Sequence, residues 1–355
     1  MKSKVQTAVV GVTGYAGAEL ARILLRHPRL KGLPPVFAGR LDEKDAARGG
    51  VLLTEIHPHL ADNNGSHLLK MEPFSWQLLT ERGVDVLFLA TPHEQSRSWV
   101  PEALARGMRV IDLSGAWRLV HPANRAVYGF EDANPALAAA TQQEAVYGMP
   151  ELHRAQIAKA RLVANPGCYA TSVILPLKPL VAAGIVDLDA GIIADSKSGV
   201  SGAGKAPTAK THFMYAADNL SAYGVFTHRH TGELLEQIGI HKDAIVFAPH
   251  LLPIPRGILS TIYVRFVAPQ SRESIQGMYR DFFHGSPMVR LYDSSLPQIQ
   301  YSVRTSYADI GFQLSADGKR AVIVSCLDNL LKGASSQAVQ NLNVMYGWGE
   351  AEGLE

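Results

Sequence analysis

The chain has 355 residues, of which 47% are hydrophobic and 19% charged, so it is long enough for two globular domains. A formal net charge of +2, without a long Lys/Arg run, argues against a dedicated nucleic-acid surface. The two cysteines, Cys168 and Cys326, give no disulfide framework, and no apolar run approaches the roughly 18 residues of a membrane span. Met1 to Lys4 lead into a strand-like segment without a signal-peptide core. We therefore expect a cytoplasmic protein without nucleic-acid or membrane partners.

A glycine-rich turn follows the first predicted strand. Residues 5–10 are β-rich, residues 11–17 have the spacing Gly-x-x-Gly-x-x-Gly, and residues 18–27 predict a helix that Pro28 ends. In this context the backbone can approach a pyrophosphate at a helix N-terminus, although a tight turn without a ligand is the alternative. The expected dinucleotide-binding residues of this turn are Gly11, Thr13, Gly14, Tyr15, Ala16 and Gly17.

The second predicted strand, residues 35–40, bears on the choice of dinucleotide. NAD sites commonly place an acid at the end of this strand, but here it ends in Gly39-Arg40. An arginine suits a 2′-phosphate, so Arg40 favours NADP(H) over NAD(H). Asp42 and Glu43 follow closely and leave NAD(H) as the alternative.

Two further predicted strands complete the pattern of the first half. Residues 84–90 form an apolar run that delivers Thr91, Pro92 and His93 at its carboxyl end, where ligands bind in open α/β sheets. His93 is expected to border the cofactor or to be a solvated loop residue. Residues 109–114 predict another strand. Alternating strands and helices indicate a doubly wound domain.

Cys168 lies where a strand gives way to a helix near the middle of the chain. Residues 161–164 predict a short strand, Pro166-Gly167 breaks it, and residues 171–177 predict a helix. A helix N-terminus lowers a thiol pKa and stabilises the nucleophilic thiolate. The alternative is a small buried hydrophobic residue, a common role for a free cysteine.

The next part of the chain carries a second group of polar residues. Residues 191–197 predict a strand that enters a loop, residues 198–205, rich in glycine, small hydroxyls and lysine. Its N–H groups suit an anion, and a flexible linker is the alternative. His228 and His230 then precede Glu233, which is placed to pair with the preceding turn. A histidine beside an acid is a usual acid–base arrangement, whereas zinc would need further ligands, so no metal is expected.

The remaining predicted strands indicate a second, sheet-forming domain. Residues 244–253, 258–266 and 320–326 are strand-like without βαβ spacing. Cys326 ends the last of them and is interpreted as structural. Residues 328–340 predict a helix that packs on the first domain.

These motifs together resemble N-acetyl-γ-glutamyl-phosphate reductases, enzymes of arginine biosynthesis similar to aspartate-semialdehyde dehydrogenase. The resemblance covers nearly the whole chain and rests on residues 11–20, 90–94, 147–151, 165–169, 198–204, 228–230 and 328–334. Pro166-Gly167-Cys168-Tyr169 discriminates best, because related dehydrogenases surround their cysteine differently.

The resemblance implies a two-domain architecture and a reaction. A Rossmann NADP-binding domain would occupy residues 1–165, completed by a helix in 330–355, and an α+β catalytic and dimerisation domain would occupy 166–329. Cys168 would attack an acyl phosphate, phosphate would leave a thioester, and hydride from NADPH would give an aldehyde. His230 would be the acid–base, oriented by Glu233, with His228 as second choice.

The remaining site residues also follow from the resemblance. Further cofactor contacts are expected from Thr91, Pro92, Ser198, Gly199, Asn329 and Lys332. Substrate contacts are expected from Glu151, Ser201, Arg118 and Asn165. The partners would be the acyl phosphate, inorganic phosphate and further copies of the chain in a dimer or tetramer.

The sequence departs from the family pattern at three places. Gly232 stands where a proline is usual, Ala116 replaces an acid, and residues 304–306 read Arg-Thr-Ser in place of a Gly-Ser-Asn-like turn. Three other functions stay open: reduction of a carrier-linked aminoadipyl or glutamyl phosphate, aspartate-semialdehyde dehydrogenase activity, and a non-catalytic NADP-binding regulator.

Overall fold

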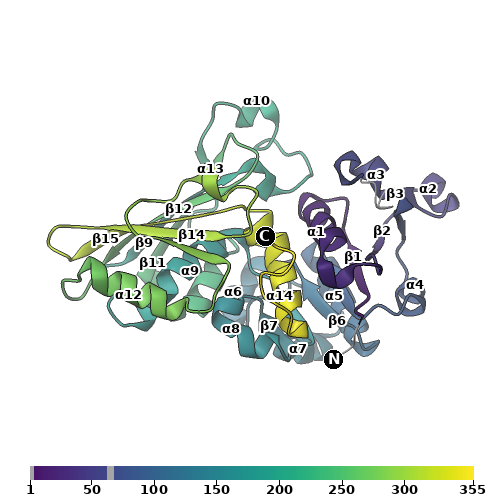
Figure 1. The fold of residues 1–355 in the computed structure, drawn as a ribbon, viewed down its shortest axis with the longest axis horizontal. Helices are drawn as coiled ribbons and strands as arrows, with labels where there is room; N and C mark the ends of the chain where they lie inside the picture. The colour runs from purple at the N-terminus through teal and green to yellow at the C-terminus, as the bar shows by residue number, and fades with distance from the viewer. Residues whose placement is uncertain (1–3, 62–67) are drawn as a thin grey trace. The chain divides into compact units, whose positions relative to one another are not determined.

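The computed structural model describes residues 4–61 and 68–355, which divide into two units with one sheet each (Figure 1). Unit 1 comprises the described residues of Met1–Arg118, Glu131–Asn165 and Ser335–Glu355, and unit 2 comprises Leu119–Phe130 and Pro166–Ala334. This division differs from the expected one at two places. Leu119–Phe130 belongs to unit 2 because the backbone N–H groups of Val120 and His121 donate to Glu236. Residues 330–334 belong there too, because Asp328 anchors them to Arg256.

Unit 1 contains an eight-stranded sheet in the order β3-β4-β2-β1-β5-β6-β8-β7. The strands are β1 (Thr7–Val10), β2 (Val36–Gly39), β3 (Val51–Leu52), β4 (Lys70–Pro73), β5 (Val86–Leu89), β6 (Arg109–Asp112), β7 (Ala145–Tyr147) and β8 (Leu162–Ala164). All neighbouring strands are parallel except β3, which is antiparallel to β4. The predicted doubly wound α/β architecture is confirmed.

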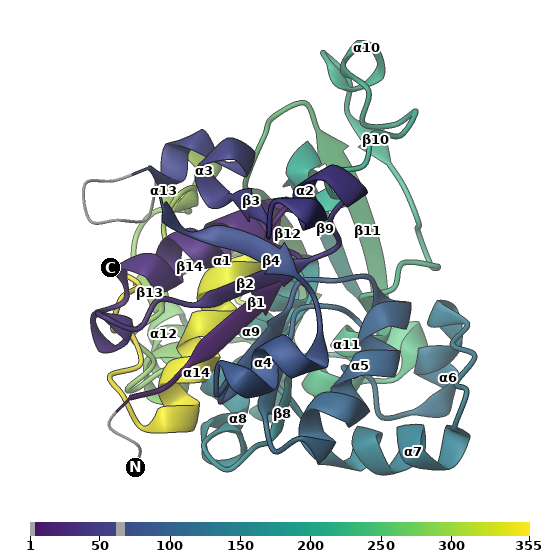
Figure 2. The ribbon, with the colours of Figure 1, turned by 90° about the vertical axis from the view of Figure 1, so that its right-hand side faces the viewer.

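Helices on the faces of this sheet complete unit 1. They are α1 (Tyr15–Arg26), α2 (Glu43–Ala47), α3 (Leu53–Ile56), α4 (Trp76–Glu81), α5 (His93–Ala105), α7 (Pro135–Glu144), α8 (Pro150–Ile157) and α14 (Ser336–Tyr346). Helix α1 begins three residues before the predicted start, and it buries Leu20, Ile23 and Leu24. Helix α14 packs against α1 and α8 (Figure 2). The last helix of the chain is therefore part of the core of unit 1.

Unit 2 contains a mixed seven-stranded sheet in the order β10-β11-β9-β12-β15-β14-β13. The strands are β9 (Ile192–Gly199), β10 (Ser221–Ala222), β11 (Ile245–Leu252), β12 (Ile258–Arg265), β13 (Val289–Tyr292), β14 (Ala308–Leu314) and β15 (Arg320–Leu327). The helices are α6 (Pro122–Arg125), α9 (Cys168–Ala182), α10 (Phe213–Ala216), α11 (Thr231–Leu234), α12 (Arg272–Phe282) and α13 (Ile299–Ser302). The predicted α+β second domain is confirmed.

Helix α9 is the centre of unit 2. It packs on β9, β12 and β15, and α12 packs against it on the same side of the sheet (Figure 1). The Tyr279 hydroxyl of α12 donates to the carbonyl of Pro176 at 2.8 Å. Almost every residue from Tyr169 to Leu180 is buried, so the start of α9 is held firmly.

In the described part of the chain, no helix is both long and apolar enough to cross a membrane.

Candidate active site

Cys168 is the first residue of α9, and Gly167 is its N-cap. The helix begins at the cysteine itself rather than at Thr171, because the N–H and the hydroxyl of Thr171 both donate to the Gly167 carbonyl. The thiol is half-buried. The structure thus places the thiol at a helix N-terminus, a position where the dipole favours a thiolate.

A glycine from the end of unit 2 packs directly against the cysteine. A Cβ atom on Gly333 would lie 2.7 Å from the Cβ of Cys168. Gly333 belongs to one turn of π-helix, Leu331–Ser335, a feature that is frequent at functional sites. Sequence reasoning missed this contact, because nothing in the motif of residues 328–334 says which side chain it meets.

Asp328 fixes the turn that carries Gly333. Its buried carboxylate accepts hydrogen bonds from the backbone N–H groups of Leu330 and Arg304, at 2.8 and 2.7 Å, and from the guanidinium of Arg256 at 3.1 Å. The Gly333 N–H donates to the Asp328 carbonyl. Asp328 is a second residue that sequence reasoning did not single out.

His230 and Glu233 lie beside Gly167, next to the cysteine in the chain. A Cβ atom on Gly167 would lie 2.5 Å from His230 Nε2, so the ring packs flat on this glycine. Glu233 is fully buried and accepts the Gly167 N–H at 2.9 Å, and its other oxygen is 3.9 Å from His230 Nε2. The sequence predicts that Glu233 pairs with the turn before it, whereas in the structure it accepts its hydrogen bond from the turn that carries Cys168.

His228 occupies an aromatic cluster. Its ring contacts Tyr169, Tyr223 and Phe247 edge-on, and its Nδ1 accepts the His230 N–H at 3.1 Å. Burial, with the charge of Arg229 as a smaller cause, lowers the pKa of His228 to about 4. This histidine is neutral near pH 7 and cannot readily serve as a general acid.

The loop of residues 198–205 is ordered by hydrogen bonds rather than extended as a linker. Strand β9 continues to Gly199, and a 3₁₀ turn, Val200–Ala203, follows. The Asn329 side chain donates to the Ser201 hydroxyl at 2.9 Å and accepts the Gly257 N–H at 2.7 Å. The side chains of Ser198 and Asn329 are buried close to this turn. The Lys332 side chain is fully buried in the π-helical turn Leu331–Ser335.

The glycine turn of unit 1 fits a pyrophosphate. Gly11 has φ +96°, and a Cβ there would lie 2.2 Å from the carbonyl oxygen of Ala90; a Cβ on Gly17 would lie 2.2 Å from that of Gly11. At Gly14 the nearest atom to such a Cβ is 3.6 Å away, and no side chain caps α1. The first and third glycines thus permit tight packing, and the second leaves room for a ligand at the N-terminus of α1.

The other predicted cofactor residues of unit 1 lie at the carboxyl ends of its strands. Arg40 follows β2 and is exposed, and Thr91 and Pro92 follow β5. His93 begins α5, and its Nδ1 accepts the Gly115 N–H at 2.8 Å, so it is not a solvated loop residue. These ends flank β1 and its glycine turn.

Three predicted substrate residues are buried in unit 1. The guanidinium of Arg118 donates to the carbonyls of Asn165 and Leu113 at 2.7 and 2.8 Å. Asn165 Oδ1 accepts from Asn341 at 3.0 Å, and Glu151 Oε1 accepts from Gln340 at 2.9 Å. These hydrogen bonds give all three residues a structural role within unit 1.

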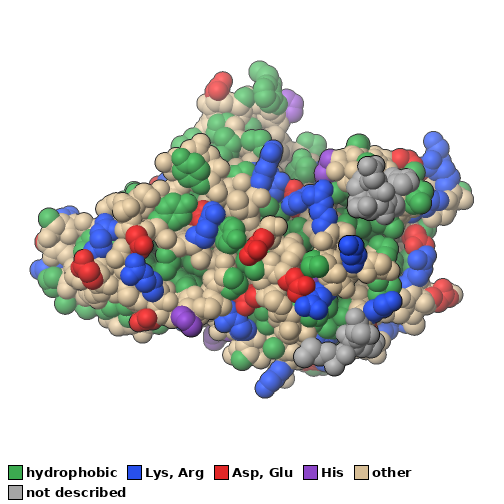
Figure 3. Space-filling view, in the orientation of Figure 1, with side chains coloured by type: hydrophobic (Ala, Val, Ile, Leu, Met, Phe, Trp, Pro, Cys, Tyr) green, Lys and Arg blue, Asp and Glu red, His purple; other side chains and the backbone are tan. Residues whose placement is uncertain are grey.

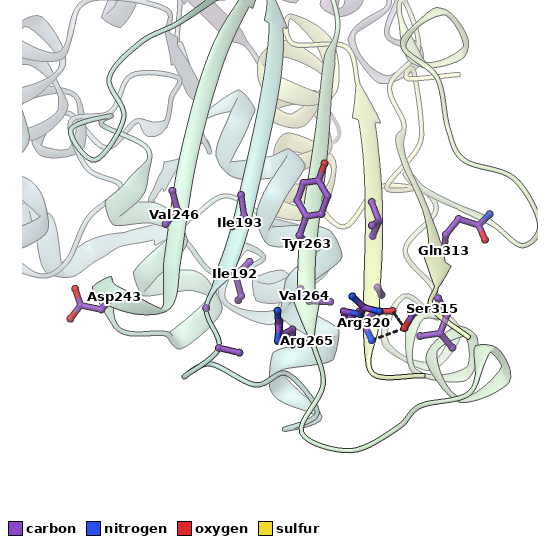
Figure 4. A pocket seen from close by; sticks show the side chains of 15 residues that line it. Ile192, Ile193, Asp243, Val246, Tyr263, Val264, Arg265, Gln313, Ser315 and Arg320 are labelled. Atoms are coloured by element: carbon purple, nitrogen blue, oxygen red, sulfur yellow. Dashed lines mark hydrogen bonds between the residues drawn. The ribbon is translucent and has the colours of Figure 1, made fainter. Parts of the chain in front are cut away.

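A cavity of about 750 Å³ lies in unit 2 (Figure 4), and Cys168 is not among the residues that line it. It opens on the face of the sheet opposite α9 and is lined by Ile193, Val246 and Tyr263, with Arg265 and Arg320 at its edge. None of the four candidate catalytic side chains, Cys168, His228, His230 and Glu233, lines it. Groups of three or more metal-binding side chains are absent from the residues that the structure describes.

Comparison with known proteins assigns both units. Residues 6–160 match the family model for the semialdehyde dehydrogenase NAD binding domain, and residues 168–329 match that for the semialdehyde dehydrogenase dimerisation domain. N-acetyl-gamma-glutamyl-phosphate reductase from Dehalococcoides mccartyi strain CBDB1 is 43% identical, covering 99% of this chain and 98% of the relative. The chain belongs to the N-acetyl-gamma-glutamyl-phosphate reductase family. The same-named protein of Geobacillus kaustophilus is 39% identical over 98% of this chain and 97% of its own length.

Solved structures agree with this family at the level of fold. Aspartate semialdehyde dehydrogenase II from Vibrio cholerae matches with a TM-score of 0.69 and 18% identity, covering 98% of this chain and 99% of that one. Aspartate semialdehyde dehydrogenase with NADP from Candida albicans has a TM-score of 0.69 and 14% identity, covering 98% and 99%. This chain thus has the fold of these aspartate semialdehyde dehydrogenases.

The structure explains two departures from the reductase family pattern. A Cβ on Gly232 would lie 2.9 Å from Leu119 Cδ1 and 3.0 Å from Asn124 Cβ, so a proline has no room beside the 119–130 segment. Arg304 has φ +65°, which is a left-handed backbone conformation. It stands at the first position of the Gly-Ser-Asn-like turn of the family pattern. The hydrogen bond from its N–H to Asp328 holds that conformation. Nothing in the structure explains the loss of an acid at Ala116.

Proposed function

We propose that this chain catalyses the NADPH-dependent reduction of N-acetyl-L-glutamyl 5-phosphate to N-acetyl-L-glutamate 5-semialdehyde, with release of phosphate. The observation that carries the proposal is Cys168 at the first position of α9, beside the His230–Glu233 pair. Relatives about 40% identical over nearly the whole chain carry the name of this reductase.

The thiolate of Cys168 attacks the acyl carbon, and phosphate leaves to give a thioester. Splitting the reaction in this way avoids direct reduction of a stabilised acid derivative. N–H groups at the start of α9 are placed to stabilise an oxyanion, a contribution typically of about 3–4 kcal/mol. His230 moves the proton when the thiohemiacetal collapses to the aldehyde and frees the thiolate. Glu233, which also accepts the Gly167 N–H, keeps the ring beside the cysteine turn.

The glycine turn at α1 and the ends of β2 and β5 would hold the dinucleotide, with Ser198, Gly199, Asn329 and Lys332 as further candidates. When bound, the dinucleotide supplies the hydride that reduces the thioester. We propose NADP(H) rather than NAD(H), because Arg40 is exposed at the end of β2 and makes no hydrogen bond or ion pair with the described residues.

The substrate is proposed to be the free acyl phosphate. Ser201, whose hydroxyl accepts a hydrogen bond from Asn329, lies within the loop of residues 198–205 and is a candidate substrate contact. Arg118, Asn165 and Glu151 are proposed to shape the site through their buried hydrogen bonds. A carrier protein would favour a strongly basic rim. Figure 3 instead shows basic and acidic side chains interspersed over the visible face, in keeping with the net charge of +2.

The deciding assay measures phosphate-dependent reduction of NADP by N-acetylglutamate semialdehyde, with aspartate semialdehyde in parallel. We expect turnover with the acetylated substrate only. Mass spectrometry of enzyme mixed with acyl phosphate, without dinucleotide, should detect an acyl adduct on the Cys168 peptide. Cys168→Ser should bind dinucleotide but lose nearly all turnover. A fully active Cys168→Ser enzyme would end the proposal.

Cys326 supplies the matched control for that assay. It is fully buried in β15, and burial raises the pKa of its thiol to about 12. Cys326→Ser should therefore retain turnover, and iodoacetamide at neutral pH should alkylate Cys168 first.

The preference for NADP(H) is tested by Arg40→Ala. Loss of the guanidinium should remove most of the discrimination between the two dinucleotides, because a charge-assisted contact to the 2′-phosphate is lost. The ratio of kcat/KM for NADP and NAD measures it, with the exposed Arg280→Ala as control. An unmodified enzyme equally efficient with both dinucleotides contradicts this assignment.

We further propose that the chain is a cytoplasmic homo-oligomer. Residues 168–329 match a dimerisation domain, and the outer sheet face leaves Ile193, Val246 and Tyr263 between 36% and 49% exposed. A second copy would cover these side chains. The two cysteines are free thiols, which suits a reducing compartment.

A further inference from the structure

Three buried serine hydroxyls connect the sheet of unit 2 to the first turns of α9. Ser196 lies on β9, Ser260 on β12 and Ser172 on α9, and all three are 0% exposed. The Oγ atoms of Ser196 and Ser260 are 2.7 Å apart, and those of Ser260 and Ser172 are also 2.7 Å apart. The Ser172 hydroxyl lies 2.8 Å from the carbonyl oxygen of Tyr169, the residue that follows Cys168.

The direction of this chain follows from counting protons. Each serine has one O–H, and a carbonyl oxygen can only accept. Ser172 donates to the Tyr169 carbonyl, so Ser260 must donate to Ser172, and Ser196 must donate to Ser260. The chain therefore runs from β9 through β12 to the first turn of α9, and Ser260 is its central link.

The neighbouring strand provides a contrast. Ser325 on β15 lies directly opposite Ser260 in the sheet, and it too is 0% exposed. Its hydroxyl makes no hydrogen bond within the described part of the chain. Ser196, Ser260 and Ser325 thus form one row across three strands, of which only the first two are linked to α9.

We propose that Ser260 and Ser172 are positioning residues for Cys168: their hydroxyl chain fixes the height and rotation of the first turn of α9 on the sheet. Tyr169 is anchored a second time, because its hydroxyl donates to the His250 carbonyl at 2.6 Å. Neither serine is placed to touch substrate or dinucleotide. The proposal rests on the proposed function, because it concerns the sulfur that forms the thioester.

The test compares Ser260→Ala and Ser172→Ala with Ser325→Ala as the matched control. Two readouts are used: steady-state kinetics, and the rate of iodoacetamide alkylation of Cys168 followed by peptide mass spectrometry from pH 5 to 9. We expect Ser260→Ala and Ser172→Ala to lower kcat by about 10- to 100-fold, the scale of a small misplacement of a reacting group, with KM for NADP(H) unchanged. We also expect the inflection of the alkylation profile to move to higher pH, because the sulfur loses its alignment with the N–H groups of α9.

Ser196→Ala should have a smaller effect, because Ser260 can still donate to Ser172. Ser325→Ala should match the unmodified enzyme in both readouts. If Ser260→Ala lowers the melting temperature too far for assay, Ser172→Ala decides, because alanine suits a helix interior. Ser260→Ala or Ser172→Ala enzyme with the kcat and alkylation profile of Ser325→Ala would overturn the proposal. The alkylation readout needs no acyl phosphate, so failure of the proposed substrate would be seen separately, as absent turnover in the unmodified enzyme.

Discussion

At the residue scale, His228 and His230 are two positions apart, their ring centroids are 4.7 Å apart, and both rings lie beside Tyr169. They differ in their other neighbours, because His230 packs on Gly167 beside the cysteine turn, whereas His228 contacts Tyr223 and Phe247. We expect His230→Asn to lower kcat by about 10²–10⁴-fold with the fold intact, because a general acid–base is lost. Circular dichroism and the pH dependence of kcat check this. A large loss in His228→Asn but not in His230→Asn would reverse the assignment.

His228 should make the protein sensitive to mild acid. Its folded pKa, lowered to about 4, is below the ordinary 6.5, so as pH falls the unfolded chain takes up a proton that the folded chain excludes. Stability from this group is fully present above pH 6.5 and is lost as pH falls to about 4. Between pH 7.5 and 4.5, the free energy of unfolding should fall by about 1–3 kcal/mol less in His228→Asn than in the unmodified protein. Urea unfolding at the two pH values measures this difference. As a control, His284→Asn, at an exposed position, should lose as much stability as the unmodified protein. Identical losses in the unmodified protein and both variants would refute the assignment.

At the element scale, the π-helical turn Leu331–Ser335 fits closely against the start of α9. Gly333→Ala would place a methyl group 2.7 Å from the Cys168 Cβ, so the turn or the cysteine must shift. We expect a fall in kcat of about 10-fold or more and a loss of stability of about 1–3 kcal/mol. Gly277→Ala in α12 is the control, because its Cβ would meet nothing within 4 Å, and it should be neutral or stabilising. Activity of Gly333→Ala equal to that of the control would contradict this packing.

The same elements show how far the sequence could be read. Strands such as β5 and β15, and the turn between β1 and α1, were predictable because apolar runs and glycine spacing are local signals. The start of α9 at Cys168 was not, because Thr171 closes the turn back onto Gly167. The contacts of Gly333 and the inclusion of Leu119–Phe130 in unit 2 depend on residues more than a hundred positions away.

At the scale of the whole molecule, the outer face of the unit 2 sheet is where we expect a second copy to pack. Val246→Arg would bury an unpaired charge in that interface and should weaken dimerisation by about 10- to 100-fold. Analytical ultracentrifugation over a range of concentrations measures it. Leu137→Arg, on an exposed face of α7 in unit 1, is the control. If both variants leave the mass unchanged, the copies meet elsewhere.

Helix α14 has a consequence for biosynthesis. Unit 1 contains the first strand of the chain and also the last helix, whose residues Ala338, Val339 and Leu342 are fully buried against it. The dinucleotide-binding half therefore cannot complete its fold until α14 has been made, whereas every residue of unit 2 precedes Ser335. The N-terminal strands of unit 1 are made early but complete their fold last. A released chain truncated after Ala334 should thus show protease resistance in unit 2 and sensitivity in unit 1.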